Sequence, residues 1–451
     1  MIDLMSNLYT NLGEYLSFSQ SSISELLLGY NKKPKTDEPT GYGRWHELPK
    51  DIMEIIIQRL NSTDRVRLSI VCKSWRPLVM QKDIPAAPQI PWLLLPHGPD
   101  CKRLSFYSLE EGKVHNLKLP KSAQGGWCCG SSKGWLVISK ETSFKSEIFL
   151  LNPISGARRQ LPSLTTIPSF DTFVESLPDD HIVSSFINRI ELSSSDTSDC
   201  VVAAIFDSDR ILAFCRPEDK SWSIFEGRDE DEEFIYHDIL FSNETLYVLP
   251  SRKINGVFTA VNCTFGFEDR EVDLKFLPAL RIPEPEFVGA IEVFDDYRIV
   301  QGGLLDTYLV ESINGELMVI FKIMDVLQGK DEEDEEEAFD VQYYRAREFE
   351  VYKVDPNNGT CCMTCRLKDL GGQVLFLTNS GSVSLQARDF NGFQGNCIYF
   401  AADRAYYNDH HPLVSRDPGV FYLDDGRIER SFPSVDLPIH SMMSWFTPIP
   451  W

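Results

Sequence analysis

Paired cysteines and histidines are the residues in this sequence whose types and spacing could support chemistry. Cys362 and Cys365 stand three positions apart with Cys361 beside them, and His410 and His411 are adjacent in a polar stretch. A tetrahedral zinc site needs four ligands, and no second Cys or His pair stands at a usable spacing. A thioredoxin-type site needs a βαβ unit, which the surrounding pattern does not predict. We therefore expect free thiols, surface histidines, and no bound metal or cofactor.

Other patterns typical of catalysis are missing from the sequence. It contains no Gly-x-Ser-x-Gly elbow, no glycine-rich phosphate loop with a lysine, and no His-Glu-x-x-His pair. Its acids gather instead in two runs, five at 229–233 and seven at 331–337. Adjacent carboxylates repel one another and stay solvated, which does not suit an acid–base pair. We expect no catalytic residues, and two loops that either only add solubility or steer a basic target toward the protein.

The charge balance narrows the range of partners. Lys and Arg number 44 against 67 Asp and Glu, a formal net charge of −23, and no basic stripe stands out. Nucleic acid and anionic lipid both need their phosphate charge neutralised, so neither is an expected partner. No apolar run approaches the roughly 18 residues that cross a bilayer. The eleven cysteines are spread without a dense framework, which suits a reducing compartment. We expect an intracellular protein, in the nucleus and/or the cytoplasm.

Three zones with different residue patterns follow one another along the chain. Residues 1–40 are expected to form a variable helical extension and linker, and residues 41–84 a compact helical block. From 85 to 451 the sequence changes to short apolar or alternating runs separated by turn signals such as Leu151-Asn-Pro-Ile-Ser-Gly156. Many short strands over such a length fit a β-propeller of six to eight blades better than a single sandwich. The predicted fold is mainly β, with a small α domain before a propeller-like domain.

The helical block carries more apolar surface than it can bury alone. Pro49 suits a first helical turn, and Ile52, Ile55, Ile56 and Leu60 then recur at helical spacing, predicted to lie on one face. About 35 residues in two or three short helices cannot cover all of these side chains. Either the block docks on the rest of the chain, or this face waits for a partner.

The block resembles an F-box. The matching segments are Trp45-His-Glu-Leu-Pro-Lys-Asp-Ile52 and Val71-Cys-Lys-Ser-Trp-Arg76, in the right order and spacing. The resemblance implies a three-helix block that binds a Skp-type adaptor. The adaptor attaches such a protein to the cullin scaffold of an SCF ubiquitin ligase. One departure is Ile57, on a face that usually points to solvent or to a neighbouring element. The implied adaptor-binding positions are Leu48, Pro49, Ile52, Ile55, Ile56, Leu60, Val71, Cys72 and Trp75.

The β region is similar to the C-terminal domain of a large group of plant F-box proteins. The similarity spans about 130–451, beginning with Lys133-Gly-Trp-Leu136 and continuing through Asn396-Cys-Ile-Tyr-Phe400 and Gly419-Val-Phe-Tyr-Leu423. It implies a plant source and a propeller-like domain that binds an unknown protein target for ubiquitination.

Two classes of function remain open. In the first, the chain is a non-catalytic substrate receptor of a ubiquitin ligase, and the chemistry takes place on partner subunits. In the second, the propeller binds a small ligand or houses an enzyme, and the F-box only controls the turnover of the chain itself. A receptor gated by a small ligand or a modification lies between the two. The lack of a catalytic constellation favours the first class.

Overall fold

The structure is a computed structural model, and it describes most of the chain from Pro49 to Ile449. Outside the described residues lie 1–48, 61–63, 66–67, 69–74, 80–87, 96, 98–101, 143–144, 177–185, 208–209, 226–233, 253–261, 268–269, 278–292, 295–296, 330–341, 355–365, 379–380, 402–405, 409–410, 416–417, 431, 433–442 and 450–451. The predicted extension at 1–40, the acidic runs at 229–233 and 331–337, and the Cys362–Cys365 pair therefore lie outside them.

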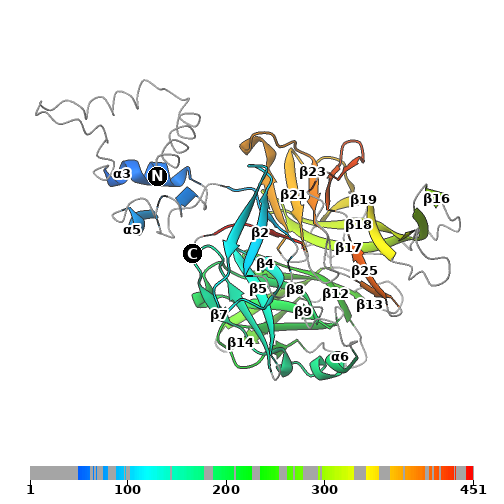
Figure 1. Ribbon diagram of the computed structural model, residues 1–451, viewed down its shortest axis with the longest axis horizontal. Helices are drawn as coiled ribbons and strands as arrows, with labels where there is room; N and C mark the ends of the chain where they lie inside the picture. Colours follow the sequence, from blue (N-terminus) through cyan, green and yellow to red (C-terminus); the bar gives the residue numbers. More distant parts are fainter. Residues whose placement is uncertain are drawn as a thin grey trace, which may run out of the picture. The chain divides into compact units, whose positions relative to one another are not determined.

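Two helices are described in the N-terminal block, and the rest of the described chain is mainly β (Figure 1). The helices of the block are α3 (Lys50–Gln58) and α5 (Arg76–Val79). A third α-helix, α6 (Phe170–Ser176), and three short 3-10 turns at Leu164–Thr166, Thr197–Asp199 and Ala387–Asp389 belong to the β region. The prediction of a mainly β fold with a small α domain is confirmed.

The strands form six sheets, which are the six blades of a propeller, within the predicted range of six to eight. The innermost strands of successive blades lie side by side in the order β28, β4, β8, β12, β17 and β22 around the centre. From the centre outward, blade 1 contains β28 (Ser444–Phe446), β1 (Trp92–Leu94), β2 (Arg103–Ser108) and β3 (Lys113–Lys118). Blade 2 contains β4 (Trp127–Ser132), β5 (Trp135–Thr142), β6 (Lys145–Leu151) and β7 (Arg158–Gln160). Blade 3 contains β8 (Ile187–Leu192), β9 (Val202–Phe206), β10 (Ile211–Cys215) and β11 (Ser223–Ile224).

Blades 4 to 6 depart from a simple antiparallel meander. Blade 4 contains β12 (Phe234–Ser242), β13 (Thr245–Arg252), β15 (Arg270–Phe276) and β14 (Asn262–Phe267), with β13 and β15 parallel. Blade 5 contains β16 (Val293–Phe294), β17 (Tyr297–Glu311), β18 (Leu317–Gly329) and β19 (Gln342–Val354). Strand β19 also pairs with β20 (Arg366–Leu367) and with β25 (His411–Ser415), and β25 pairs in turn with β24 (Tyr406–Asn408). Blade 6 contains β22 (Val383–Gln386), β21 (Gln373–Leu377), β23 (Cys397–Phe400), β26 (Gly419–Tyr422) and β27 (Ile428–Glu429), with β21 and β23 parallel.

The two ends of the propeller meet in blade 1. Strand β28 near the C-terminus pairs antiparallel with β1, with Leu93 opposite Trp445. The hydroxyl of Ser131 on the neighbouring blade donates to the carbonyl oxygen of Trp445 at 2.6 Å. The side-chain amide of Asn152 donates to the carbonyl oxygen of Ile449 at 2.7 Å, so the segment after β28 is also held. One strand from the far end of the chain therefore closes the ring.

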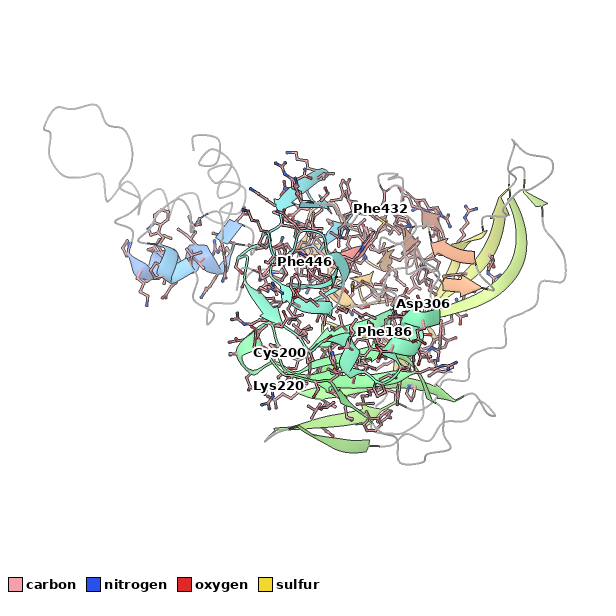
Figure 2. The ribbon with its side chains drawn as sticks, turned by 60° about the horizontal axis from the view of Figure 1, so that its bottom comes forward. Phe186, Cys200, Lys220, Asp306, Phe432 and Phe446 are labelled. Carbon is pink, nitrogen blue, oxygen red and sulfur yellow. The ribbon has the colours of Figure 1, made fainter. Side chains whose placement is uncertain are left out.

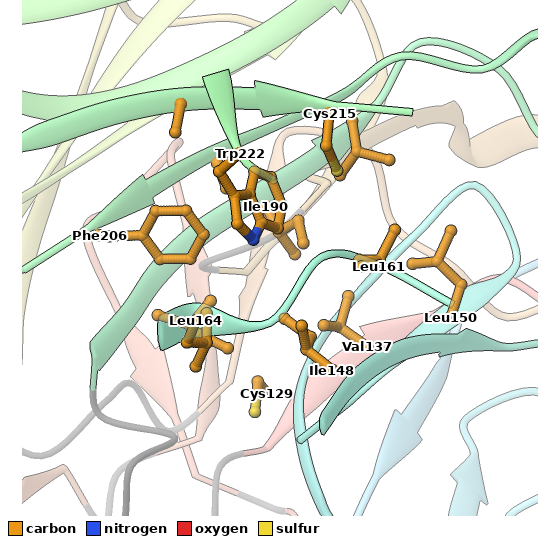
Figure 3. Packing of buried hydrophobic residues seen from close by; sticks show 14 of the residues in the cluster. Cys129, Val137, Ile148, Leu150, Leu161, Leu164, Ile190, Phe206, Cys215 and Trp222 are labelled. Carbon is orange, nitrogen blue, oxygen red and sulfur yellow. The ribbon is translucent and has the colours of Figure 1, made fainter. Parts of the chain in front are cut away.

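The hydrophobic core is divided among the six spaces between neighbouring blades. Each buried cluster draws its side chains from two adjacent blades. Figure 3 shows the cluster between blades 2 and 3, to which blade 2 contributes Val137 and Leu150 and blade 3 contributes Ile190 and Phe206. Because both sides of a middle strand are covered, β9 is apolar throughout and all five of its residues are buried.

Candidate functional sites: an open helical face and a polar propeller centre

Helix α3 has two apolar sides, and only one of them is covered. Met53 is 2% exposed and Ile57 is fully buried, whereas Ile55 is 49% exposed. Ile52 and Ile56 lie on the same side as Ile55 and are half-buried. At 3.6 residues per turn, positions 52, 55 and 56 share one face, and positions 53 and 57 share another. The open face is therefore a surface of three isoleucines, which we call the isoleucine face.

Leu60 does not lie on this isoleucine face, contrary to the prediction that it shares one face with the isoleucines. The helix ends at Gln58, and Leu60 is buried two residues later, where its N–H donates to the carbonyl oxygen of Ile57 at 3.1 Å. Ile57, expected to point to solvent or to a neighbouring element, is on the covered side. The Nε atom of the buried Arg65 donates to the same Ile57 carbonyl at 3.1 Å, which satisfies the end of the helix.

The nine predicted adaptor-binding residues fall into three groups. Pro49, Ile52, Ile55 and Ile56 are exposed or half-buried, and Leu60 and Trp75 are buried. Leu48, Val71 and Cys72 lie outside the described residues. Adaptor binding by these positions stays a prediction.

A cluster of buried charges joins the inner strands of blades 3, 4 and 5. Arg189 on β8 lies 3.4 Å from the carboxylate of Asp238 on β12 and donates to Asp306 on β17 at 3.2 Å. All three side chains are less than one-tenth exposed. Tyr308 donates its hydroxyl to the Asp306 carboxylate at 3.0 Å. Figure 2 labels Asp306 among the side chains of the propeller. We call Arg189, Asp238 and Asp306 the central charge cluster.

A third buried carboxylate, that of Glu191, extends this polar region to blade 2. The hydroxyl of Ser132 on β4 donates to the Glu191 carboxylate at 2.9 Å, and the Lys133 ammonium lies 3.8 Å from the same carboxylate. Glu191 stands two residues after Arg189 on β8. Hydrogen bonds and opposite charges thus satisfy groups that would otherwise be costly to bury. The arrangement can lock four inner strands in register.

Sequence reasoning missed the central charge cluster. Arg189 and Asp306 are 117 positions apart. Asp306 follows two leucines in β17, whereas β8 reads Ile-Asn-Arg-Ile-Glu-Leu and is half polar. The only local signal is an acid next to apolar residues at Asp306, and that signal names no partner. The chain brings these side chains together only through the closed ring of blades.

The central charge cluster predicts a pH-dependent contribution to stability. Burial raises the pKa of Asp238 to about 7, although the nearby Arg189 and two backbone N–H donors lower it. The facing groups are Arg189 and Glu191 on β8, Asp306 and Tyr308 on β17, and Lys133; burial also raises the pKa of Glu191. Between about pH 4 and pH 7 the folded state keeps the Asp238 proton, whereas the unfolded chain releases it. The free energy of unfolding therefore falls as pH rises through this range, by about 1.4 kcal/mol for each unit by which the pKa of Asp238 in the folded state exceeds that in the unfolded chain.

The variant Asp238→Asn should lose this dependence. Urea unfolding at several pH values checks it, with the difference between wild type and variant as the readout because other carboxylates contribute to both proteins. Glu348→Gln, which changes an exposed carboxylate on blade 5, is the matched control. Identical slopes for wild type and Asp238→Asn between pH 4 and 7 would contradict the assignment.

The residues first considered for metal chemistry are only partly described. Among the described residues, no group of three or more His, Cys, Asp or Glu side chains is arranged to hold a metal ion. His410 lies outside the described residues, and His411 begins β25. Cys128 and Cys129, on β4, are buried free thiols. Within the part of the chain that the structure describes, no helix is long and apolar enough to span a bilayer.

The open helical face and the six-bladed ring define a class of protein. Residues 45–85 match the F-box domain, so this chain is an F-box protein in which a propeller follows the F-box along the sequence. Residues 106–422 match the family described as the KIB1-4 beta-propeller, and the chain belongs to that family. The resemblance to plant F-box proteins with a propeller domain is thereby confirmed.

Curated relatives agree with this assignment. The F-box/kelch-repeat protein At1g57790 of Arabidopsis thaliana is 26% identical over 385 residues, which cover 84% of this chain and 89% of that protein. The F-box protein At1g49360 of the same plant is 29% identical over 132 residues, covering 28% of this chain and 26% of that protein. A solved structure of Pseudomonas aeruginosa periplasmic gluconolactonase covers 79% of this chain and 99% of its own, at 11% identity and a TM-score of 0.35. A likeness of that size says nothing about what this chain does.

Proposed function

We propose that this chain is the substrate-recognition subunit of an SCF-type ubiquitin ligase. In this role the F-box binds a Skp-type adaptor and, through it, a cullin scaffold, while the propeller binds the target protein. The observation that carries the proposal is the open isoleucine face of α3, which lies inside the residues that match the F-box domain. A nuclear and/or cytoplasmic location goes with this role.

The isoleucine face has the chemistry of a helix-in-groove interface. Ile55 is one of four large apolar side chains that are exposed among the described residues, and the other three are Val114, Val174 and Ile313. Only Ile55 has two further isoleucines on its own helical face. A fully buried isoleucine stabilises a complex by roughly 1.5–3 kcal/mol, so the three together can anchor a small interface.

The propeller supports the second half of the proposal by its rigidity. Each blade is fixed to its neighbours by a buried apolar cluster, and the centre is fixed by the central charge cluster. Loops on a rigid ring are suited to selecting a protein target. In the proposed ligase the chain contributes positioning, and ubiquitin transfer takes place on partner subunits.

Target capture by a variant that cannot engage the adaptor tests this function. A full-length chain with Ile52, Ile55 and Ile56 each replaced by Asp should still bind targets in plant cells but no longer pass them on for ubiquitination. Quantitative mass spectrometry of proteins captured by the two chains should show targets enriched on the variant, with less attached ubiquitin. If the variant captures a small molecule or turns over a substrate while no protein is enriched, the propeller is instead a ligand-binding or enzymatic domain.

A further inference from the structure

The outer edge of blade 1 is an unusually long and open strand. Strand β3 has six residues and is the last strand of its sheet, whereas the outer strands β7, β11, β20 and β27 have two or three. Strand β14 is as long as β3, but it contains no Lys or Arg. None of the six residues of β3 is buried. A long exposed edge is a template on which another chain can add a strand.

The pairing of β3 with β2 determines which of its backbone groups face outward. The N–H of Leu119 donates to the carbonyl oxygen of Lys102 at 2.9 Å, and Arg103 pairs with Lys118. In an antiparallel ladder, hydrogen-bonded and non-hydrogen-bonded pairs alternate. Lys113, His115 and Leu117 therefore bond to β2. The N–H and C=O groups of Val114, Asn116 and Lys118 point away from the sheet, and a new strand could bond to them.

The charge around this edge is opposite to that of the whole protein. Residues 102–121 contain five Lys or Arg and two Glu, in a chain with a net charge of −23. Lys102, Arg103, Lys118 and Lys121 are exposed at the end of the hairpin far from the turn. Arg103 and Lys118 stand directly opposite one another, where like charges cost stability. The exposed lysines at this end of the hairpin, Lys102, Lys118 and Lys121, favour an anionic partner.

We propose that the edge of β3 docks an extended acidic segment of the target protein, which adds to blade 1 as a further strand. The proposal rests on the proposed function, since it names the class of target segment that the propeller selects. Lysines on an edge repel a second copy of the same edge, so charge complementarity favours an acidic partner over self-pairing. Val114, 47% exposed at the other end of the strand, offers the bound segment an apolar contact as well.

A labelled peptide that alternates glutamate with valine tests the proposal. Its binding to the full-length chain is measured by fluorescence anisotropy at low and at physiological salt, beside a peptide that alternates lysine with valine. The acidic peptide should bind, more weakly at higher salt, because exposed charges are screened over roughly 8–10 Å. Replacing Lys102 and Lys118 with Glu should weaken binding by about tenfold or more. The same charge change at Lys220 and Lys368, exposed on other blades, should have little effect.

A backbone variant separates strand addition from simple charge attraction. Asn116→Pro removes an outward N–H and keeps the backbone bonds to β2, whereas Asn116→Ala keeps that N–H. Both variants lose the bond that the Asn116 side chain accepts from the Ser105 hydroxyl on β2 at 2.8 Å, so this loss cancels in the comparison. We expect weaker binding by Asn116→Pro alone, with unchanged adaptor binding in every variant. Should Asn116→Pro fail to fold, Val114→Pro beside Val114→Ala makes the same comparison at another outward N–H. The proposal would be overturned if both peptides bound equally well or the acidic peptide did not bind. It would also be overturned if the Lys102 and Lys118 changes had no effect, or if the chain dimerised through this edge. Loss of adaptor binding by the unaltered chain would instead contradict the proposed function.

Discussion

Trp445→Ala is expected to destabilise the propeller by about 3–5 kcal/mol, because it removes a large side chain from the strand that closes the ring. Trp445 is 2% exposed and contacts the ring of Phe376 on blade 6 edge-on, with 5.2 Å between ring centroids. Its strand β28 is the innermost strand of blade 1. The cavity would therefore open between the first and last blades, where the three residues of β28 pair with β1 and close the ring. The midpoint of urea unfolding, followed by tryptophan fluorescence and circular dichroism, measures the loss.

Ile313→Ala is the matched control for this experiment. Ile313 lies in a turn of blade 5 and is 46% exposed, so its truncation should change stability by less than about 0.5 kcal/mol. If Trp445→Ala unfolds at the same urea concentration as Ile313→Ala, β28 does not close the ring.

Ile55→Asp is expected to weaken adaptor binding by about a hundredfold or more. The substitution places a charge at the most exposed position of the isoleucine face, where a bound adaptor would have to desolvate it without a partner. The fold should be unaffected because Ile55 is half exposed and lies opposite the covered side of α3. Isothermal titration of a Skp-type adaptor into the purified chain gives the affinity.

Ile313→Asp provides the comparison for Ile55→Asp, since it introduces the same charge at an isoleucine of similar exposure on the propeller. It should bind the adaptor as the wild type does. Equal affinities for Ile55→Asp and Ile313→Asp would show that the isoleucine face is not the adaptor contact.

Strands and turns of the propeller could be predicted because their signals are local. The run 201–206 is apolar at every position, and the structure buries all of it between two neighbouring blades. The predicted turn after Leu151 is stabilised by Asn152, whose side-chain oxygen accepts hydrogen bonds from the backbone N–H groups of Ile154 and Ser155. Gly156 has a φ of +74°, which glycine adopts without strain.

Features that depend on distant parts of the chain could not be predicted. The exchange of strand order in blades 4 and 6 leaves no local signal, because the residues of a strand do not specify whether it pairs with the next strand in the chain or with the one after it. On α3, periodicity showed that the helix is apolar but could not decide which side is covered. Leu60 falls beyond the helix end at Gln58, so its apparent place on the isoleucine face was an extrapolation of the period.

Reconstitution of the complex tests the central claim most directly. The purified chain is mixed with a Skp-type adaptor and a cullin, and size-exclusion chromatography shows whether the three elute together. We predict one stable complex for the wild type and for Ile313→Asp, and a free chain when Ile52, Ile55 and Ile56 are replaced by Asp. A wild-type chain that elutes apart from the adaptor, or a triple variant that still elutes with it, would contradict the account of this protein as a ligase receptor.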